Sequence, residues 1–334
     1  MRSFKPIALT SGEPAGIAPE ISGSAWHELH DRRDFCFFLL GDAGYWAKRN
    51  PGEIAIRRIG HPDEAVAVFG SALPVLHRPL ARHPLAGRIE PENASRVIAS
   101  IDEAVALVCD GLVSAIVTNP IQKESLYAAG FNHQGHTDYI AHLARGRGHD
   151  VHEVMMLAAK DLRTVPVTVH IPLAEVPHAL TTVAIVDQAR VVARDLTRYF
   201  GISHPRLAFT GLNPHAGENG AMGNEERTII EPALRQLASE GLDVRGPLPA
   251  DTAFHAEARS GYDAILCMYH DQALIPVKTL DFHGGVNISL GLPFIRTSPD
   301  HGTALDIAGQ GAANPQSLIA ALKLAVQMSR SAGV

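Results

Sequence analysis

The sequence of 334 residues has few cysteines, no long apolar run and no excess of positive charge. Its cysteines, Cys36, Cys109 and Cys267, lie far apart and form no CxxC pair, which argues against a disulfide framework or a thiolate zinc site. No apolar run reaches the roughly 20 residues of a membrane span, and the first residues do not resemble a signal peptide. The net charge of −6 disfavours binding to nucleic acid or to an anionic membrane. We therefore expect a cytoplasmic protein.

The patterning that is present indicates an α/β fold. Apolar residues make up 46% and charged residues 19% of the chain, as in ordinary globular proteins, and the length favours two domains. Short β-branched runs alternate with longer segments of helical period, which is typical of α/β architecture. The predicted helices span residues 92–108, 183–200, 225–240 and 315–328, and the predicted strands span residues 7–10, 35–40, 54–59, 115–118, 154–158, 165–169, 206–210 and 264–268.

Histidine is unusually abundant, with 18 in the chain. His170, His215 and His270 each follow closely after a predicted strand, so all three would lie along one edge of a sheet. Three neutral imidazoles can hold a divalent transition metal and leave coordination positions open for a substrate. Their spacing matches no local metal motif, so on this pattern alone three unrelated histidines are the simpler interpretation.

Two loop segments have features of ligand-binding loops. Residues 10–20, TSGEPAGIAPE, lead from a strand through small residues into a helix, where backbone N–H groups could hold an anion. The segment is neither GxGxxG nor a Walker A motif, and an ordinary strand-to-helix turn is the simpler interpretation. In GHTD, residues 135–138, His136 and Thr137 could bind a ligand, but on this segment alone the simpler interpretation is that Thr137 or Asp138 caps the following helix.

The segment of residues 270–311 holds the densest set of polar candidates. Lys278, Asn287 and Arg296 could together hold a phosphate and a carboxylate, with arginine supplying a bidentate fork. Asn287 and Arg296 lie in a nearly apolar stretch, where a charge or an amide requires a partner. That partner could also be an internal carboxylate.

Six longer motifs follow one another along the chain: SGEPAGIAPE, GHTDYIAHLA, LNPHAGENGAMGNEE, GPLPADTAF, MYHDQALIPVK and GVNISLGLPFIRTSPDHGTALDIAG. Together and in this order, they resemble the family of 4-hydroxythreonine-4-phosphate dehydrogenases, the PdxA family. The resemblance covers most of the chain and is least diagnostic at about residues 40–110. Two positions depart from the family pattern: Ala18 replaces a glycine, and Asn119 stands before Pro120 where relatives carry a small residue.

The resemblance implies a fold similar to that of the isocitrate and isopropylmalate dehydrogenases, with the active site in a cleft between two α/β domains. We expect residues 1–130 and 300–334 to form the first domain, and residues 131–299 to form the second. Family members are homodimers with active sites at the subunit interface and metal ligands from both chains. They use NAD without a Rossmann fingerprint, which fits the missing GxGxxG motif; NADP remains open.

The resemblance also implies roles for individual residues. The metal ligands carry over to His170, His215 and His270, and the native metal is left open among zinc, magnesium, cobalt and manganese. Asp251 and Lys278 are the candidates for the proton acceptor, because sequence cannot show which one reaches the proton. The substrate contacts carry over to His136, Thr137, Lys278, Asn287 and Arg296.

The implied reaction is the oxidation of 4-phosphooxy-L-threonine to 2-amino-3-oxo-4-phosphooxybutanoate. This β-keto acid loses carbon dioxide to give 3-amino-2-oxopropyl phosphate, in pyridoxal 5′-phosphate (vitamin B6) biosynthesis. One alternative is a paralogous dehydrogenase of 4-phospho-threonate or 4-phospho-erythronate. More remote alternatives are a metal-dependent phosphoester hydrolase and a non-catalytic ligand-binding protein of α/β type.

Overall fold

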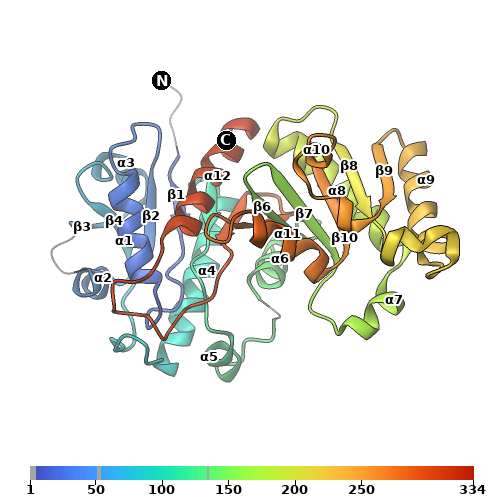
Figure 1. Ribbon diagram of the computed structural model, residues 1–334. Helices are drawn as coiled ribbons and strands as arrows, with labels where there is room; N and C mark the ends of the chain where they lie inside the picture. Colours follow the sequence, from blue (N-terminus) through green and yellow to red (C-terminus); the bar gives the residue numbers. More distant parts are fainter. Residues whose placement is uncertain (1–4, 51–53, 134) are drawn as a thin grey trace. The chain divides into compact units, whose positions relative to one another are not determined.

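A computed structural model describes residues 5–50, 54–133 and 135–334. The chain forms two compact units: unit 1 comprises Met1–Val151 and Leu292–Val334, and unit 2 comprises His152–Gly291. Both units are α/β, which confirms the predicted fold class (Figure 1). In the described part of the chain, none of the helices has the combination of length and apolar character needed to cross a membrane.

Unit 1 is built on a parallel sheet with the strand order β3-β4-β2-β1-β5-β12. Strand β2 is buried along its whole length, as expected for parallel strands that are covered on both faces. The described strands are β1 (Ile7–Leu9), β2 (Phe37–Gly41), β3 (Ile56–Ile59), β4 (Leu73–His77), β5 (Ala115–Val117) and β12 (Arg296–Pro299).

The helices of unit 1 cover this sheet because each has one apolar side. In α4, Val97, Ile101 and Val105 recur every fourth residue and are all buried. The described helices of unit 1 are α1 (Ala18–Leu29), α2 (Ala43–Arg49), α3 (Ala65–Val68), α4 (Ala94–Cys109), α5 (Lys123–Ala128), α6 (His136–Gly146) and α12 (Gln316–Ala332), with short 3₁₀ turns at Pro62–Glu64 and Pro91–Asn93.

Unit 2 has a mixed sheet with the strand order β11-β6-β7-β10-β8-β9. The pairs β11–β6 and β6–β7 are antiparallel, whereas β7, β10, β8 and β9 run parallel to one another. The described strands are β6 (Val154–Ala159), β7 (Leu162–Thr168), β8 (Arg206–Thr210), β9 (Asp243–Leu248), β10 (Ala264–Tyr269) and β11 (Val286–Leu290).

The longest helix of unit 2, α8, has a clear signal at each end. The Thr181 hydroxyl accepts a hydrogen bond from the Ala184 amide, and Gly201 ends the helix at a φ of +70°. The described helices of unit 2 are α7 (Val176–Ala179), α8 (Thr182–Phe200), α9 (Glu231–Ser239), α10 (Ala256–Arg259) and α11 (His270–Leu280), with 3₁₀ turns at Leu173–Glu175, Pro214–Gly220 and Ala250–Thr252 and a π-helical turn at Glu226–Ile230.

The boundary between the units differs from the predicted domain boundary. Residues 131–151 and 292–299 belong to unit 1, although we expected them in the second domain. Helix α6 packs against α4, and β12 pairs in parallel with β5, so both segments are tied to unit 1. His136, Thr137 and Arg296 therefore lie in unit 1, whereas the other candidate residues lie in unit 2.

Candidate functional site

The loops that follow β1, β5 and β12 pack against one another in unit 1. The Glu13 amide donates to the Pro120 carbonyl (2.8 Å), and the Ile17 amide donates to the Thr303 carbonyl (3.1 Å). Gly12 has a φ of +63°, and a Cβ there would lie 2.7 Å from the Pro120 oxygen, so the close approach requires glycine. These contacts hold the three loops in one arrangement.

The loop after β1 uses several of its amides inside the protein. The Ala15 amide donates to the Glu13 carboxylate (3.0 Å), and the Gly16 amide donates to the Glu13 carbonyl (3.1 Å). The Glu13 and Ile17 amides also donate within the protein, and these four internal hydrogen bonds favour an ordinary strand-to-helix turn over an anion-binding loop.

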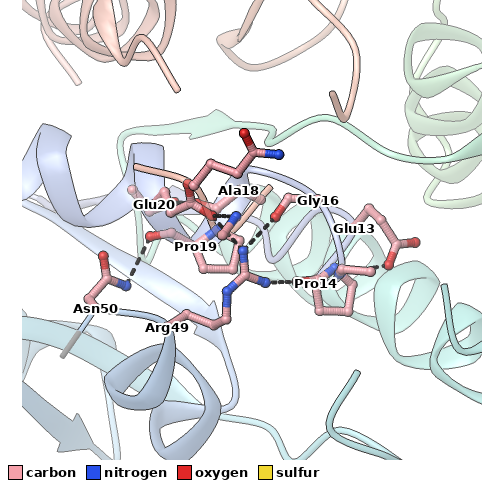
Figure 2. A network of polar contacts seen from close by, with 12 residues as sticks. Glu13, Pro14, Gly16, Ala18, Pro19, Glu20, Arg49 and Asn50 are labelled. Atoms are coloured by element: carbon pink, nitrogen blue, oxygen red, sulfur yellow. Dashed lines mark hydrogen bonds and ion pairs between the residues drawn. The ribbon is translucent and has the colours of Figure 1, made fainter. Parts of the chain in front are cut away.

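Arg49, at the end of α2, also holds the loop that follows β1. Figure 2 shows its guanidinium facing the Pro14 and Gly16 carbonyls, to which it donates at 3.0 and 3.2 Å, and the Glu20 carboxylate, which it meets at 2.5 Å. Glu20 also accepts the Gly309 amide (2.6 Å). The side chains of Arg49 and Glu20 are only 10% and 13% exposed, so this ion pair is shielded from water.

Arg296, the first residue of β12, brings the predicted residues of unit 1 together. Its guanidinium donates to the Thr118 hydroxyl at the end of β5 (2.7 Å) and to the Thr137 hydroxyl on α6 (3.4 Å). The residue is 2% exposed, and this burial lowers the pKa of Arg296 to about 9. The group is therefore still a cation at neutral pH, held in a largely dry environment.

His136 lies beside this cation and is neutral. Burial, the charge of Arg296 and the charge of Lys123 hold the pKa of His136 well below its ordinary value. Its Nε2 atom is buried and has no hydrogen-bond partner among the described residues. A neutral imidazole next to a buried guanidinium can bind an oxygen of an anionic ligand.

Two side chains of GHTD make contacts outside the first turn of α6. Helix α6 begins after Gly135 without a side-chain cap among the described residues. Instead the Thr137 hydroxyl accepts from Arg296, and the Asp138 carboxylate lies 3.1 Å from Nδ1 of His133. The structure thus orients Thr137 toward the buried arginine.

In unit 2, His170 and His270 lie side by side. His170 follows β7 and His270 begins α11 directly after β10, and these two strands are paired in parallel, with Tyr269 opposite Thr168. The two imidazole rings are 5.6 Å apart between centroids. They line a cavity of about 200 Å³ together with Thr168, Ile171, Leu173, Val176, Tyr269 and Asp271.

His270 is oriented in the manner of many metal-bound histidines. Its Nδ1 lies 2.8 Å from the Asp271 carboxylate, which leaves Nε2 as the ligating atom. His215 lies in the 3₁₀ segment after β8, and the described residues contain no group of three or more histidine, cysteine or acidic side chains that could hold a metal. A single chain therefore brings together two of the three predicted ligands.

The remaining candidates lie on three different elements of unit 2. Lys278, on α11, places its ammonium 5.4 Å from the centre of the Phe282 ring. Asn287 lies on β11 and is half-buried, and Asp251 is exposed in the Ala250–Thr252 turn. These positions do not distinguish Asp251 from Lys278 as the proton acceptor.

Sequence reasoning missed two residues of the unit 1 site. Thr118, which accepts a hydrogen bond from Arg296, was not among the predicted site residues. Lys123, whose charge acts on His136, was not singled out. The available signal was their shared segment, a polar turn that directly follows the buried strand β5.

Comparisons with known proteins agree with one another. The family described as "Pyridoxal phosphate biosynthetic protein PdxA" matches residues 34–325. Two relatives named 4-hydroxythreonine-4-phosphate dehydrogenase are similar to this chain. The one from Bradyrhizobium diazoefficiens is 51% identical over 97% of each chain, and the one from Caulobacter vibrioides is 50% identical over 99% of each chain. A solved structure of the enzyme with that name from Klebsiella pneumoniae has a TM-score of 0.87 and 37% identity, and the match covers 97% of this chain and 99% of that one.

Removing the Arg49 side-chain charge should destabilise unit 1. Arg49→Met removes one donor from each of the Pro14 and Gly16 carbonyls and from the Glu20 carboxylate, so we expect a loss of about 2 kcal/mol in the free energy of unfolding. Urea denaturation measures the loss, with Lys48→Met, an exposed change on the same helix, as control. Equal stability of the two variants would contradict the importance of this network.

The low pKa of His136 predicts a pH-dependent stability. As the pH falls from about 7 toward 5, the unfolded chain binds a proton that folded His136 does not accept, so the free energy of unfolding decreases. In His136→Gln this decrease should be smaller than in the wild type, whereas His149→Gln, an exposed control, should keep the wild-type slope. Identical slopes for all three proteins would show that His136 is not held neutral.

Proposed function

The chain belongs to the PdxA family of pyridoxal phosphate biosynthetic proteins, and we propose that this dehydrogenase oxidises 4-phosphooxy-L-threonine with NAD as the hydride acceptor. The observation that carries the proposal is the buried Arg296 guanidinium beside neutral His136, which suits an anionic substrate. The roughly 50% identity to relatives of that name, over nearly the whole chain, supports the same substrate.

The proposed reaction has two steps. The C3 hydride passes to NAD, and the hydroxyl proton passes to a base of the protein, for which Asp251 and Lys278 are the candidates. The resulting β-keto acid breaks its bond to the carboxylate carbon, releasing carbon dioxide, and the enolate that remains takes up a proton. Arg296, His136 and Thr137 hold an anionic end of the substrate throughout, and Lys278 and Asn287 are the other proposed substrate contacts.

The donor set in unit 2 fits a divalent metal. His170 and His270 are adjacent, and the Asp271 carboxylate orients His270 with Nε2 available. We propose that His215 is the third ligand and that zinc, cobalt, manganese or magnesium fills the site. Such an ion supplies Lewis-acid stabilisation of negative charge on the substrate oxygen.

A second copy of the chain would complete this set of ligands. Ile171 and Leu173, beside the two histidines, are 39% and 68% exposed, which is typical of a surface that another protein covers. In a two-fold symmetric dimer, His215 of one subunit can meet His170 and His270 of the other. We therefore propose a homodimer in which both chains contribute to each metal site.

Substrate comparison tests the proposed reaction. With NAD and a divalent metal, we expect NADH formation from 4-phosphooxy-L-threonine to exceed that from 4-phospho-threonate and 4-phospho-erythronate. Preference for either hydroxy acid would assign the chain to a paralogous activity. No NADH from any of the three, with metal confirmed bound, would refute the dehydrogenase chemistry.

In the same assay, replacement of the true base, by Asp251→Asn or Lys278→Gln, should lower kcat more than it changes KM.

Mixing inactive variants tests the shared metal site. His215→Ala and His270→Ala should each lose metal and nearly all turnover, whereas His204→Ala, an exposed control in unit 2, should lose neither. After subunit exchange, the mixture of the two inactive variants should recover up to about a quarter of wild-type activity, because half of the dimers would contain one intact site. No recovery, with exchange demonstrated by a tag, would place all ligands in one chain.

A further inference from the structure

The surroundings of His136 contain a second cation besides Arg296. Lys123 begins α5, and a Cβ built on Gly135 would lie 3.6 Å from its Cε and 3.8 Å from its Nζ. Gly135 directly precedes His136, so the Lys123 ammonium lies next to the start of α6. The positions of Lys123 and Arg296 therefore give His136 two cationic neighbours in unit 1.

Lys123 extends from a segment that is rigidly held. The Asn119 amide group donates to the Thr10 carbonyl and to the Ser22 hydroxyl, both at 3.0 Å. Next to Lys123, the Gln122 side chain accepts from the Thr303 hydroxyl (3.2 Å). The turn that supplies the Thr118 hydroxyl to Arg296 thus also positions the base of the Lys123 side chain.

An ordinary surface role explains Lys123 less well. The exposed lysine Lys323, for example, forms an ion pair with Glu28 at 3.0 Å. The described residues provide no hydrogen bond or ion pair for the Lys123 ammonium, and its charge, like that of Arg296, acts on His136. Two cations thus lie near His136, and no described carboxylate forms an ion pair with Lys123. This arrangement is expected where a ligand supplies the negative charge.

We infer that Lys123 and Arg296 together bind the phosphate group of the substrate at His136, and that Lys123 makes this site selective for a phosphate monoester. A phosphate monoester carries nearly two negative charges at neutral pH and a carboxylate carries one, so two cations match the phosphate better. Arg296 supplies a directional fork, Lys123 a mobile point charge, and neutral His136 a ring nitrogen. The inference rests on the proposed function and adds a residue to its substrate site.

Charge removal at Lys123 tests the inference. In Lys123→Gln we expect the KM for 4-phosphooxy-L-threonine to rise about tenfold, with kcat changed much less, because one charged contact to the phosphate is lost. Lys123→Arg should stay within about threefold of the wild type, since it keeps the charge. Lys48→Gln, an exposed lysine of the same unit, should leave KM unchanged.

Calorimetric titration with inorganic phosphate makes the test independent of turnover. Phosphate should bind the wild type and Lys48→Gln equally, and Lys123→Gln about tenfold more weakly. Equal phosphate affinity in all three proteins, or no phosphate binding by the wild type, would overturn the role of Lys123. If phosphate binding depends on Lys123 but none of the candidate substrates yields NADH, the phosphate site stands and the proposed reaction fails.

Discussion

The candidate site of unit 1 depends on one buried charge, the guanidinium of Arg296. Removing a cation from water costs several kcal/mol, so it needs polar partners in fixed positions. Thr118 and Thr137 provide hydroxyl groups from the end of β5 and the start of α6. Packing and hydrogen bonding among the surrounding loops, including the contacts of Gly12 and Arg49, hold these elements in place. A buried cation kept at such a cost is characteristic of a binding site.

The two units contribute different chemistry. In unit 1 a cation and a neutral imidazole, Arg296 and His136, suit the recognition of an anion. In unit 2 the adjacent His170 and His270 suit a metal, and Asp271 fixes the orientation of one ring. Each set of residues is drawn from several elements of its own unit, so neither appears as a local motif in the sequence.

Much of the fold was predictable because the strands and helices follow from local patterns of apolar residues in the sequence. Each of the eight predicted strands overlaps an observed strand, and the periodicity of residues 92–108 predicted α4. Strands β4, β9, β11 and β12 were missed. In β4 the pattern is interrupted by Pro74, and β12 begins with a charged residue, Arg296. The segments 131–151 and 292–299 were placed in the second domain because no linker marks the boundary and their pairing partners are distant in sequence.

The candidate site was predictable only in part. Arg296 and Thr137 are 159 residues apart, and the structure joins them through packing of α6 on α4 and pairing of β12 with β5, which no local spacing reveals. The family resemblance identified Arg296 and Thr137 as substrate contacts, and in the structure a hydrogen bond joins their side chains. Thr118 and Lys123 were missed because a hydroxyl or an ammonium becomes a candidate only when its neighbours are known.

The central claim is that a buried arginine in unit 1 binds an anionic substrate. The most direct measurement is the dissociation constant of 4-phosphooxy-L-threonine, by calorimetry without NAD, for the wild type, Arg296→Lys and Arg296→Met. Thermal unfolding curves would verify that each variant is folded. We predict weakening of at least about tenfold in Arg296→Met, with Arg296→Lys between it and the wild type, because lysine keeps the charge but loses the fork. Unchanged affinity in a folded Arg296→Met variant would contradict the account.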